Sequence, residues 1–102
     1  MPNQHPEKKY ELKIRKFLDG IGAWTLKTYS NGVQRAGVPD LLCCVNGYFV
    51  AIEVKSEKGK PSALQIWNIE KIREAGGIAI VLYPKDFDNF KSMMLRLSEV
   101  KK

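Results

Sequence analysis

The segment from Asp40 to Lys55 reads DLLCCVNGYFVAIEVK, and it decides the fold of this chain. Asn46-Gly47 is the strongest short signal for a two-residue hairpin turn, and apolar runs stand on both sides of it. We therefore predict two antiparallel strands, over residues 40–45 and 48–55. With a two-residue loop, the numbers of paired residues sum to 93, so Asp40 should lie directly opposite Glu53.

This register brings charged side chains together. Paired residues share a face of the sheet with Cβ atoms about 5 Å apart, and Lys55 lies on the same face as Glu53 because side chains alternate. Two facing carboxylates repel each other, and an uncompensated carboxylate within the apolar run around Glu53 is strongly unfavourable. A divalent cation between Asp40 and Glu53 would relieve both effects, because Mg²⁺ takes one or two carboxylates plus waters and phosphate oxygens. The alternative is that Lys55 pairs with one carboxylate while solvent hydrates the other.

The rest of the chain predicts elements that complete an α/β sandwich with a mixed sheet. Helices are indicated by apolar residues at helical spacing, and strands by short apolar runs bounded by glycine or proline. The strand after the second helix is wholly apolar, which is typical of the buried centre of a sheet, and Asp86 is positioned to cap the last helix. The order is αβββαβα in a single domain over residues 1–102, with a right-handed crossover between the last two strands. The predicted elements are a helix over 6–19, strands over 24–29, 40–45 and 48–55, a helix over 62–75, a strand over 78–83 and a helix from 87 onward.

Length and composition limit the class of protein. The chain has 102 residues, with 17 Lys+Arg against 11 Asp+Glu and a formal net charge of +6. It shows no secretory signal and no run near the ~20 apolar residues of a membrane helix, so we expect it inside the cell, in the cytoplasm of a bacterium or of a phage-infected host. The positive charge suggests an anionic partner such as nucleic acid. Cys43 and Cys44 are poorly placed to form a disulfide, and we interpret both as core residues.

Two further polar positions are candidates for the same site. Gln65 lies on the apolar stripe of its helix and should point inward, where its amide would hold a water or a phosphate. An equally good interpretation is that Gln65 completes a capping box with Ser62. In the first helix Glu7 falls within the apolar stripe and Glu11 lies at its edge, so Glu7 is the better candidate to face a site. Both glutamates would also suit the first turn of a helix for electrostatic reasons alone.

The ordered set of motifs resembles the PD-(D/E)XK nuclease superfamily, with Pro39-Asp40 followed by Glu53-Val54-Lys55. Within it the chain is most similar to the VRR-NUC family, the virus-type replication-repair nucleases, over nearly its whole length. The resemblance implies a restriction-endonuclease-like fold and hydrolysis of DNA phosphodiester bonds with Mg²⁺ or Mn²⁺ and no organic cofactor. The segments that carry it are GVPDLL at 37–42, AIEVK at 51–55, GKPSALQ at 59–65 and AGG at 75–77.

The resemblance also implies a role for each site residue. Asp40, Glu53 and the backbone carbonyl of Val54 would bind the metal ion. Lys55 would activate water or stabilise the transition state. The implied catalytic residues are Asp40, Glu53, Lys55, Gln65 and Glu7, with Glu11 as the alternative to Glu7.

DNA contacts are expected from the loops beside this face of the sheet. Arg35, with Gln34, precedes the Pro39-Asp40 motif, and Lys58 and Lys60 follow Lys55. The alternative interpretation is that these are solvated loop charges.

Leu64 and Trp67 lie on a different face of the second predicted helix from the apolar stripe that contains Gln65. We expect them either to pack under the last helix or to form a contact between subunits. A homodimer or higher homo-oligomer would suit a four-way junction, because the symmetry of the protein then mirrors that of the DNA. The sequence thus favours a structure-selective DNA endonuclease that acts on nicked, branched or four-way-junction DNA in replication, repair or recombination. The alternative is a non-catalytic nucleic-acid binding module on the same fold.

Overall fold

A computed structural model describes residues 6–29 and 36–101 of the chain. It has the predicted order of helices and strands, with one short 3-10 turn added before the last helix. The elements are α1 (Pro6–Gly20), β1 (Trp24–Lys27), β2 (Leu41–Val45), β3 (Tyr48–Val54), α2 (Ala63–Glu74), β4 (Ile78–Leu82), the 3-10 turn η1 (Pro84–Asp86) and α3 (Phe87–Glu99).

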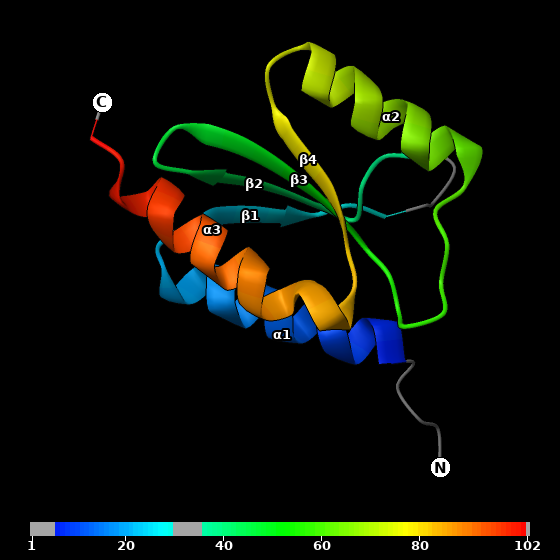
Figure 1. The fold of residues 1–102 in the computed structure, drawn as a ribbon, viewed down its shortest axis with the longest axis horizontal. Coiled ribbons are helices and arrows are strands. Elements are labelled where there is room, and N and C mark those ends of the chain that lie inside the picture. Colours follow the sequence, from blue (N-terminus) through cyan, green and yellow to red (C-terminus); the bar gives the residue numbers. More distant parts are fainter. Residues whose placement is uncertain (1–5, 30–35, 102) are drawn as a thin grey trace.

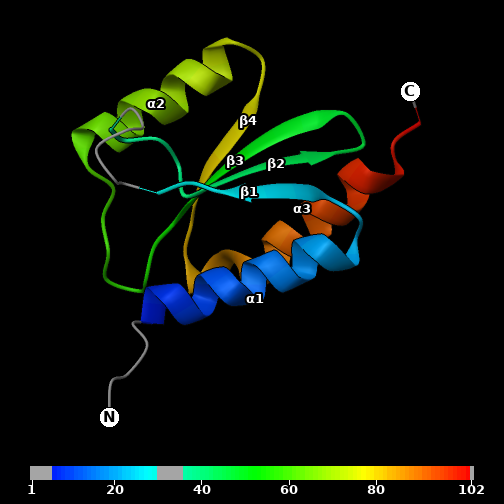
Figure 2. The same ribbon diagram turned by 180° about the vertical axis from the view of Figure 1, so that it is seen from behind.

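The molecule has three layers. A four-stranded sheet in the order β1-β2-β3-β4 forms the middle layer. Helices α1 and α3 lie side by side on one face, and α2 lies on the other (Figures 1 and 2). The first three strands are antiparallel and β4 runs parallel to β3, so the predicted α/β fold with a mixed sheet is confirmed. No helix in the described residues is long and apolar enough to cross a membrane.

The β2–β3 hairpin has the predicted register. Leu41 pairs with Ile52, and Val45 pairs with Tyr48 across the turn. Asn46-Gly47 forms the turn with positive φ angles of 51° and 82°. Positive φ at both central residues is what a type I′ hairpin turn requires, and asparagine and glycine tolerate it best.

Asn46 has a second role that the sequence does not reveal. Its side-chain amide donates hydrogen bonds to the carbonyls of Leu97 and Val100, at 2.9 and 2.6 Å. These carbonyls belong to the C-terminal end of α3, where the last C=O groups have no partner within the helix. One residue therefore shapes the hairpin turn and also caps a helix about fifty positions further along the chain.

The main core lies between the sheet and the α1–α3 layer. Ile14 and Leu18 of α1 and Met94 of α3 are fully buried there, against Val50 and Ile52 of β3. On the other face, α2 lies over β3 and β4, through a smaller cluster of Ala51, Ile69 and Ala79 against which Leu42 of β2 also packs. The part of this face that belongs to β1, β2 and the start of β3 remains exposed, with Trp24, Leu26, Cys44 and Phe49 at its surface.

Three sequence predictions about the fold are wrong. Cys43 is buried as expected, but Cys44 points to the sheet face that α2 leaves open and is exposed. Among the described strands β4 lies at the edge of the sheet and not at its centre; it is apolar because helices cover both of its faces. Asp86 occupies the N-cap position of α3, but its side chain makes no capping hydrogen bond. The preceding 3-10 turn gives Asp86 a ψ of 2°, whereas capping residues normally have extended backbone.

Asn46→Ala and Asn46→Gly should separate the two roles of Asn46. Glycine keeps the positive φ and loses only the α3 cap, so we expect a loss of about 1 kcal/mol in the free energy of unfolding. Alanine loses the cap and also strains the turn, so we expect roughly 1–2 kcal/mol more. Urea unfolding of wild type and the two variants measures both losses in the free energy of unfolding. Equal stability of wild type and Asn46→Gly would show that the cap contributes nothing.

Candidate active site

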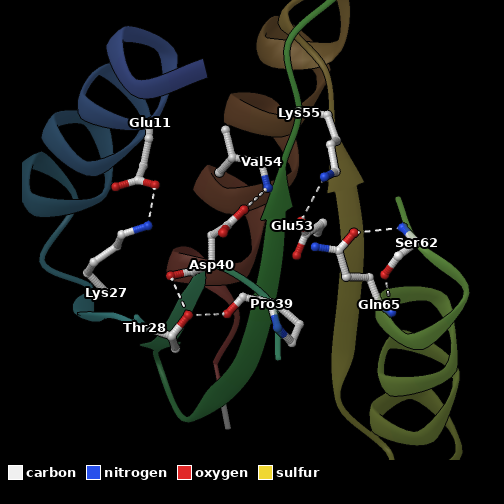
Figure 3. A network of polar contacts seen from close by, with 10 residues as sticks. All are labelled: Glu11, Lys27, Thr28, Pro39, Asp40, Glu53, Val54, Lys55, Ser62 and Gln65. Atoms are coloured by element: carbon white, nitrogen blue, oxygen red, sulfur yellow. Dashed lines mark hydrogen bonds and ion pairs between the residues drawn. The ribbon is translucent and has the colours of Figure 1, made fainter. Parts of the chain in front are cut away.

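Asp40 is fixed in place through its side chain and its backbone. The N–H of Val54 donates to Oδ2 of Asp40 at 2.8 Å, across the hairpin. The N–H of Thr28 donates to the Asp40 carbonyl at 2.9 Å. Oγ1 of Thr28 lies 2.8 Å from the Pro39 carbonyl and 3.1 Å from the Asp40 carbonyl (Figure 3). Thr28 and Pro39 are buried. The carboxylate is thus positioned before any ligand binds.

Gly37 and Asn68 fasten the segment before Pro39-Asp40 to α2. The buried Asn68 amide donates to the carbonyl of Ala36 at 3.3 Å. Gly37 has a φ of +80°, and a Cβ atom there would lie 2.6 Å from Cγ of Leu64. Only glycine satisfies both the backbone conformation and the close approach to the helix. Thr28 and Asn68 are positioning residues that sequence reasoning missed, because no local pattern marks a contact with a distant carbonyl. Gly37 opens one of the segments that carry the family resemblance, but its contact with α2 was not predicted.

Glu53 is the buried charge of the site. Its side chain is 1% exposed, and its Oε1 has no hydrogen-bond partner in the described part of the chain. Nζ of Lys55 lies 3.3 Å from its Oε2. Burial, and then the negative charge of Asp40, raise the pKa of Glu53 to about 7, although Lys55 acts in the opposite direction. The predicted convergence of Asp40, Glu53 and Lys55 is therefore present, and Lys55 offsets the two negative charges only in part.

The two glutamates of α1 have different surroundings. Glu11 is buried and forms an ion pair with Lys27 at 2.7 Å. Glu7 is half-buried, and no ion pair of Glu7 is found within residues 6–29 and 36–101. The charge of Glu7 is one of the causes that raise the pKa of Glu53. Glu7 is thus the glutamate of α1 that remains available to the site.

A pocket of about 440 Å³ lies over Asp40. Glu53 is not part of its lining, because Glu53 is almost completely covered. Lys27 lines the pocket and was not expected from the sequence. The charged and polar side chains of the lining are Glu7, Lys8, Glu11, Lys27, Asp40 and Ser56.

Gln65 completes a capping box, as one of its two interpretations predicts. The N–H of Ser62 donates to Oε1 of Gln65 at 2.8 Å, and the N–H of Gln65 donates to Oγ of Ser62 at 3.1 Å. The two interpretations are compatible, since the amide nitrogen of the same side chain points toward the Glu53 carboxylate (Figure 3). The cap therefore orients Gln65 toward the site.

The predicted DNA contacts are only partly within the structure. Lys58 and Lys60 are exposed in the loop between β3 and α2. They line a second groove and not the pocket over Asp40. Arg35 and Gln34 lie outside the described residues.

The donor atoms fit a hard divalent cation that keeps part of its water shell. In the described ranges no three His, Cys, Asp or Glu side chains lie close enough to enclose a metal ion. Asp40 and Glu53 are instead a pair, with one buried carboxylate oxygen that lacks any partner. One or two carboxylates completed by water and phosphate oxygens are the usual Mg²⁺ environment, whereas structural metal cages need more protein ligands.

This fold and this site define a PD-(D/E)XK-type nuclease domain. The model of the archaeal Holliday junction resolvase (Hjc) family matches residues 3–88, which include every site residue described above. The chain belongs to this family, whose members are nucleases that act on DNA. The superfamily prediction is thereby confirmed, and the closer resemblance to VRR-NUC stays a prediction. No curated protein and no solved structure matches the chain significantly.

Glu53→Gln should remove a pH dependence of stability. The pKa of Glu53 is about 7 in the folded protein against an ordinary 4.5, so the folded state holds this proton more tightly than the unfolded state. The free energy of unfolding of the metal-free protein should therefore fall as the pH rises from about 5 to about 8. Urea unfolding in EDTA at several pH values measures this fall. Glu53→Gln should not show this fall and should be more stable than wild type at pH 8. Identical pH profiles of the two proteins would contradict the raised pKa of Glu53.

Proposed function

We propose that this chain is a metal-dependent DNA endonuclease that hydrolyses phosphodiester bonds in branched DNA, four-way junctions above all. The proposal rests on Glu53, which is buried beside Asp40 and Lys55 with one carboxylate oxygen that lacks a partner among the described residues. This arrangement lowers the stability of the fold unless a metal cation binds to the two carboxylates. Membership of the Holliday junction resolvase family supports the choice of substrate. From the resemblance to the VRR-NUC family we further propose that the endonuclease acts in DNA replication, repair or recombination.

Each residue of the site has a task in this reaction. Asp40, Glu53 and the Val54 carbonyl would hold Mg²⁺ or Mn²⁺, which supplies a polarised phosphate and a more acidic water. The Val54 N–H keeps the Asp40 carboxylate oriented. Lys55 places a positive charge where the pentacovalent phosphate gathers negative charge.

Two further side chains support this set. Glu7 would accept a hydrogen bond from the attacking water at the α1 side of the pocket. Gln65, oriented by its cap with Ser62, would donate its amide N–H to a phosphate oxygen or a water. The candidate catalytic residues are therefore Asp40, Glu53, Lys55, Gln65 and Glu7.

A non-catalytic binding module explains less of the structure. Binding needs exposed positive charge, which the loops provide without any buried carboxylate. A module that only binds DNA would gain stability by replacing Glu53 with an apolar residue, since the neighbouring residues 50–54 of β3 are buried. The buried charge is consistent with selection for chemistry.

Asp40→Asn and Lys55→Met should reduce junction cleavage by about 100-fold or more, because each removes a charge that acts at the reacting phosphate. Cleavage of labelled single-stranded, duplex, nicked and four-way-junction DNA is measured with Mg²⁺, with Mn²⁺ and with EDTA. Lys16→Ala, an exposed lysine of α1, is the matched control and should cleave like wild type. Cleavage by the two site variants at the wild-type rate, or no cleavage by wild type with either metal, would refute the proposed activity.

We also infer a homodimer through the α2 side of the molecule. Leu64 and Trp67 are 45% and 47% exposed. The helix α3 lies on the opposite face of the sheet (Figure 2), so the two side chains do not pack under it as one interpretation predicts. The same side of the sheet exposes Trp24, Leu26 and Phe49. A second copy would remove these apolar side chains from water.

Trp67→Glu should shift the protein from dimer to monomer at micromolar concentration, because a charge at the centre of an apolar contact is strongly unfavourable. Light scattering coupled to gel filtration measures the mass. Leu95→Glu places the same charge on a residue of α3 with 44% exposure and should leave the dimer intact. A monomeric wild type would exclude the dimer without affecting the catalytic assignment.

A further inference from the structure

A second groove of about 630 Å³ lies beside the candidate active site. One wall is formed by residues 57–60 of the loop after β3, and the other by residues 83–85 at the start of η1. The groove is separate from the carboxylate pair. In the described part of the chain, none of the residues that line it forms a hydrogen bond or an ion pair with Asp40 or Glu53.

The groove is attached directly to Lys55. Ser56 lines the pocket over Asp40, and the next residue, Glu57, lines the groove. A Cβ atom on Gly59 would lie 3.3 Å from Cδ of Lys55, so this wall packs on the lysine stem. The N–H of Lys55 donates to the Leu82 carbonyl at 3.1 Å, which ties the other wall to the same residue. Lys55 thus stands between the two hollows.

The two hollows differ in charge. Three carboxylates, those of Glu7, Glu11 and Asp40, line the first pocket together with the two lysines Lys8 and Lys27, of which Lys27 is paired with Glu11. Three lysines and one glutamate line the groove. Lys58, Lys60 and Lys85 are exposed and have no ion pair within 4.0 Å in residues 6–29 and 36–101. Three lysines without an ion pair in one hollow create a positive potential that attracts an anion.

The backbone of the wall that carries Lys85 is held by two hydrogen bonds. The phenol of Tyr10 in α1 donates to the Tyr83 carbonyl at 2.7 Å, and the N–H of Asp86 donates to the same carbonyl at 2.9 Å. Burial and the charge of Asp86 raise the pKa of Tyr10 to about 12. A preformed wall loses little conformational entropy when an anion binds.

We propose that this groove binds a backbone phosphate of the cleaved DNA strand, next to the phosphate that meets Lys55, with Lys60 and Lys85 as its contacts. The inference rests on the proposed function for the identity of the anion. Lys55 separates the two hollows, so a strand that crosses it would present one phosphate to the pocket over Asp40, where the carboxylates would hold a metal ion, and the next phosphate to the basic groove. The first phosphate is then cut and the second fixes the strand in register.

The test compares Lys60→Ala/Lys85→Ala with Lys16→Ala/Lys101→Ala, which removes the same charge from exposed lysines outside the groove. Affinity for a labelled four-way junction is measured in EDTA at several salt concentrations. The groove variant should bind about tenfold more weakly and should lower the slope of log affinity against log salt by roughly 1–2, whereas the control should change both much less. Equal behaviour of the two double variants would overturn the proposal.

Neutral phosphates locate the contact. A single uncharged methylphosphonate is placed at successive positions along the strand of the junction. At the position next to the cut it should lower the affinity of wild type. At the same position it should not lower the affinity of the groove variant any further. Loss of affinity at no position, or an equal loss in both proteins, would also overturn the proposal. Cleavage of the unmodified junction by wild type in Mg²⁺ gives the cut position. If wild type does not cleave but the groove variant still binds the junction more weakly than the control variant, the proposed activity is refuted and the groove remains a phosphate site.

Discussion

The register of the β2–β3 hairpin is the constraint on which the rest of the structure depends. It is set by the Asn46-Gly47 turn and locked by packing, since a slip of one residue would expose the buried side chains of Val50 and Ile52. The same register brings the start of β2 beside the end of β3, where the N–H of Val54 meets the Asp40 carboxylate. The site geometry is therefore a consequence of core packing and not of a separate arrangement of loops.

The electrostatics of the site work against the stability of the fold. A carboxylate with 1% exposure and an unpartnered oxygen is held beside a second carboxylate, and a single lysine offsets the pair. Such local conflicts are expected where a protein binds a charged ligand, because the ligand resolves them. Residues 50–54 around it are buried on both faces of the strand, which supplies the stability that keeps Glu53 in place.

Features of the site that follow from local patterns were predictable from the sequence. The hairpin with its register and the Ser62–Gln65 capping box rest on turn preferences and on local capping patterns. The choice of Glu7 over Glu11 rests on helical periodicity and stays a prediction. The errors concern tertiary coverage: the exposure of Cys44 depends on how far α2 extends over the sheet, and the edge position of β4 depends on strand order. Likewise, the hydrogen bonds of Thr28 and Asn68 to distant carbonyls follow from the assembled fold, and no spacing in the sequence indicates them.

The anchoring of Thr28 and Gly37 has a consequence for how this protein can change. Thr28 is bonded to Pro39 and Asp40 at the start of β2, and Gly37 is seated on α2. The two contacts hold the start of β2 from two sides, from the end of β1 and from α2. A substitution that loosens either contact, such as Thr28→Val or a larger residue at Gly37, would displace the Asp40 carboxylate without altering any charged group of the site. Uncharged residues away from the carboxylates can thus determine whether the charges stand in the right place.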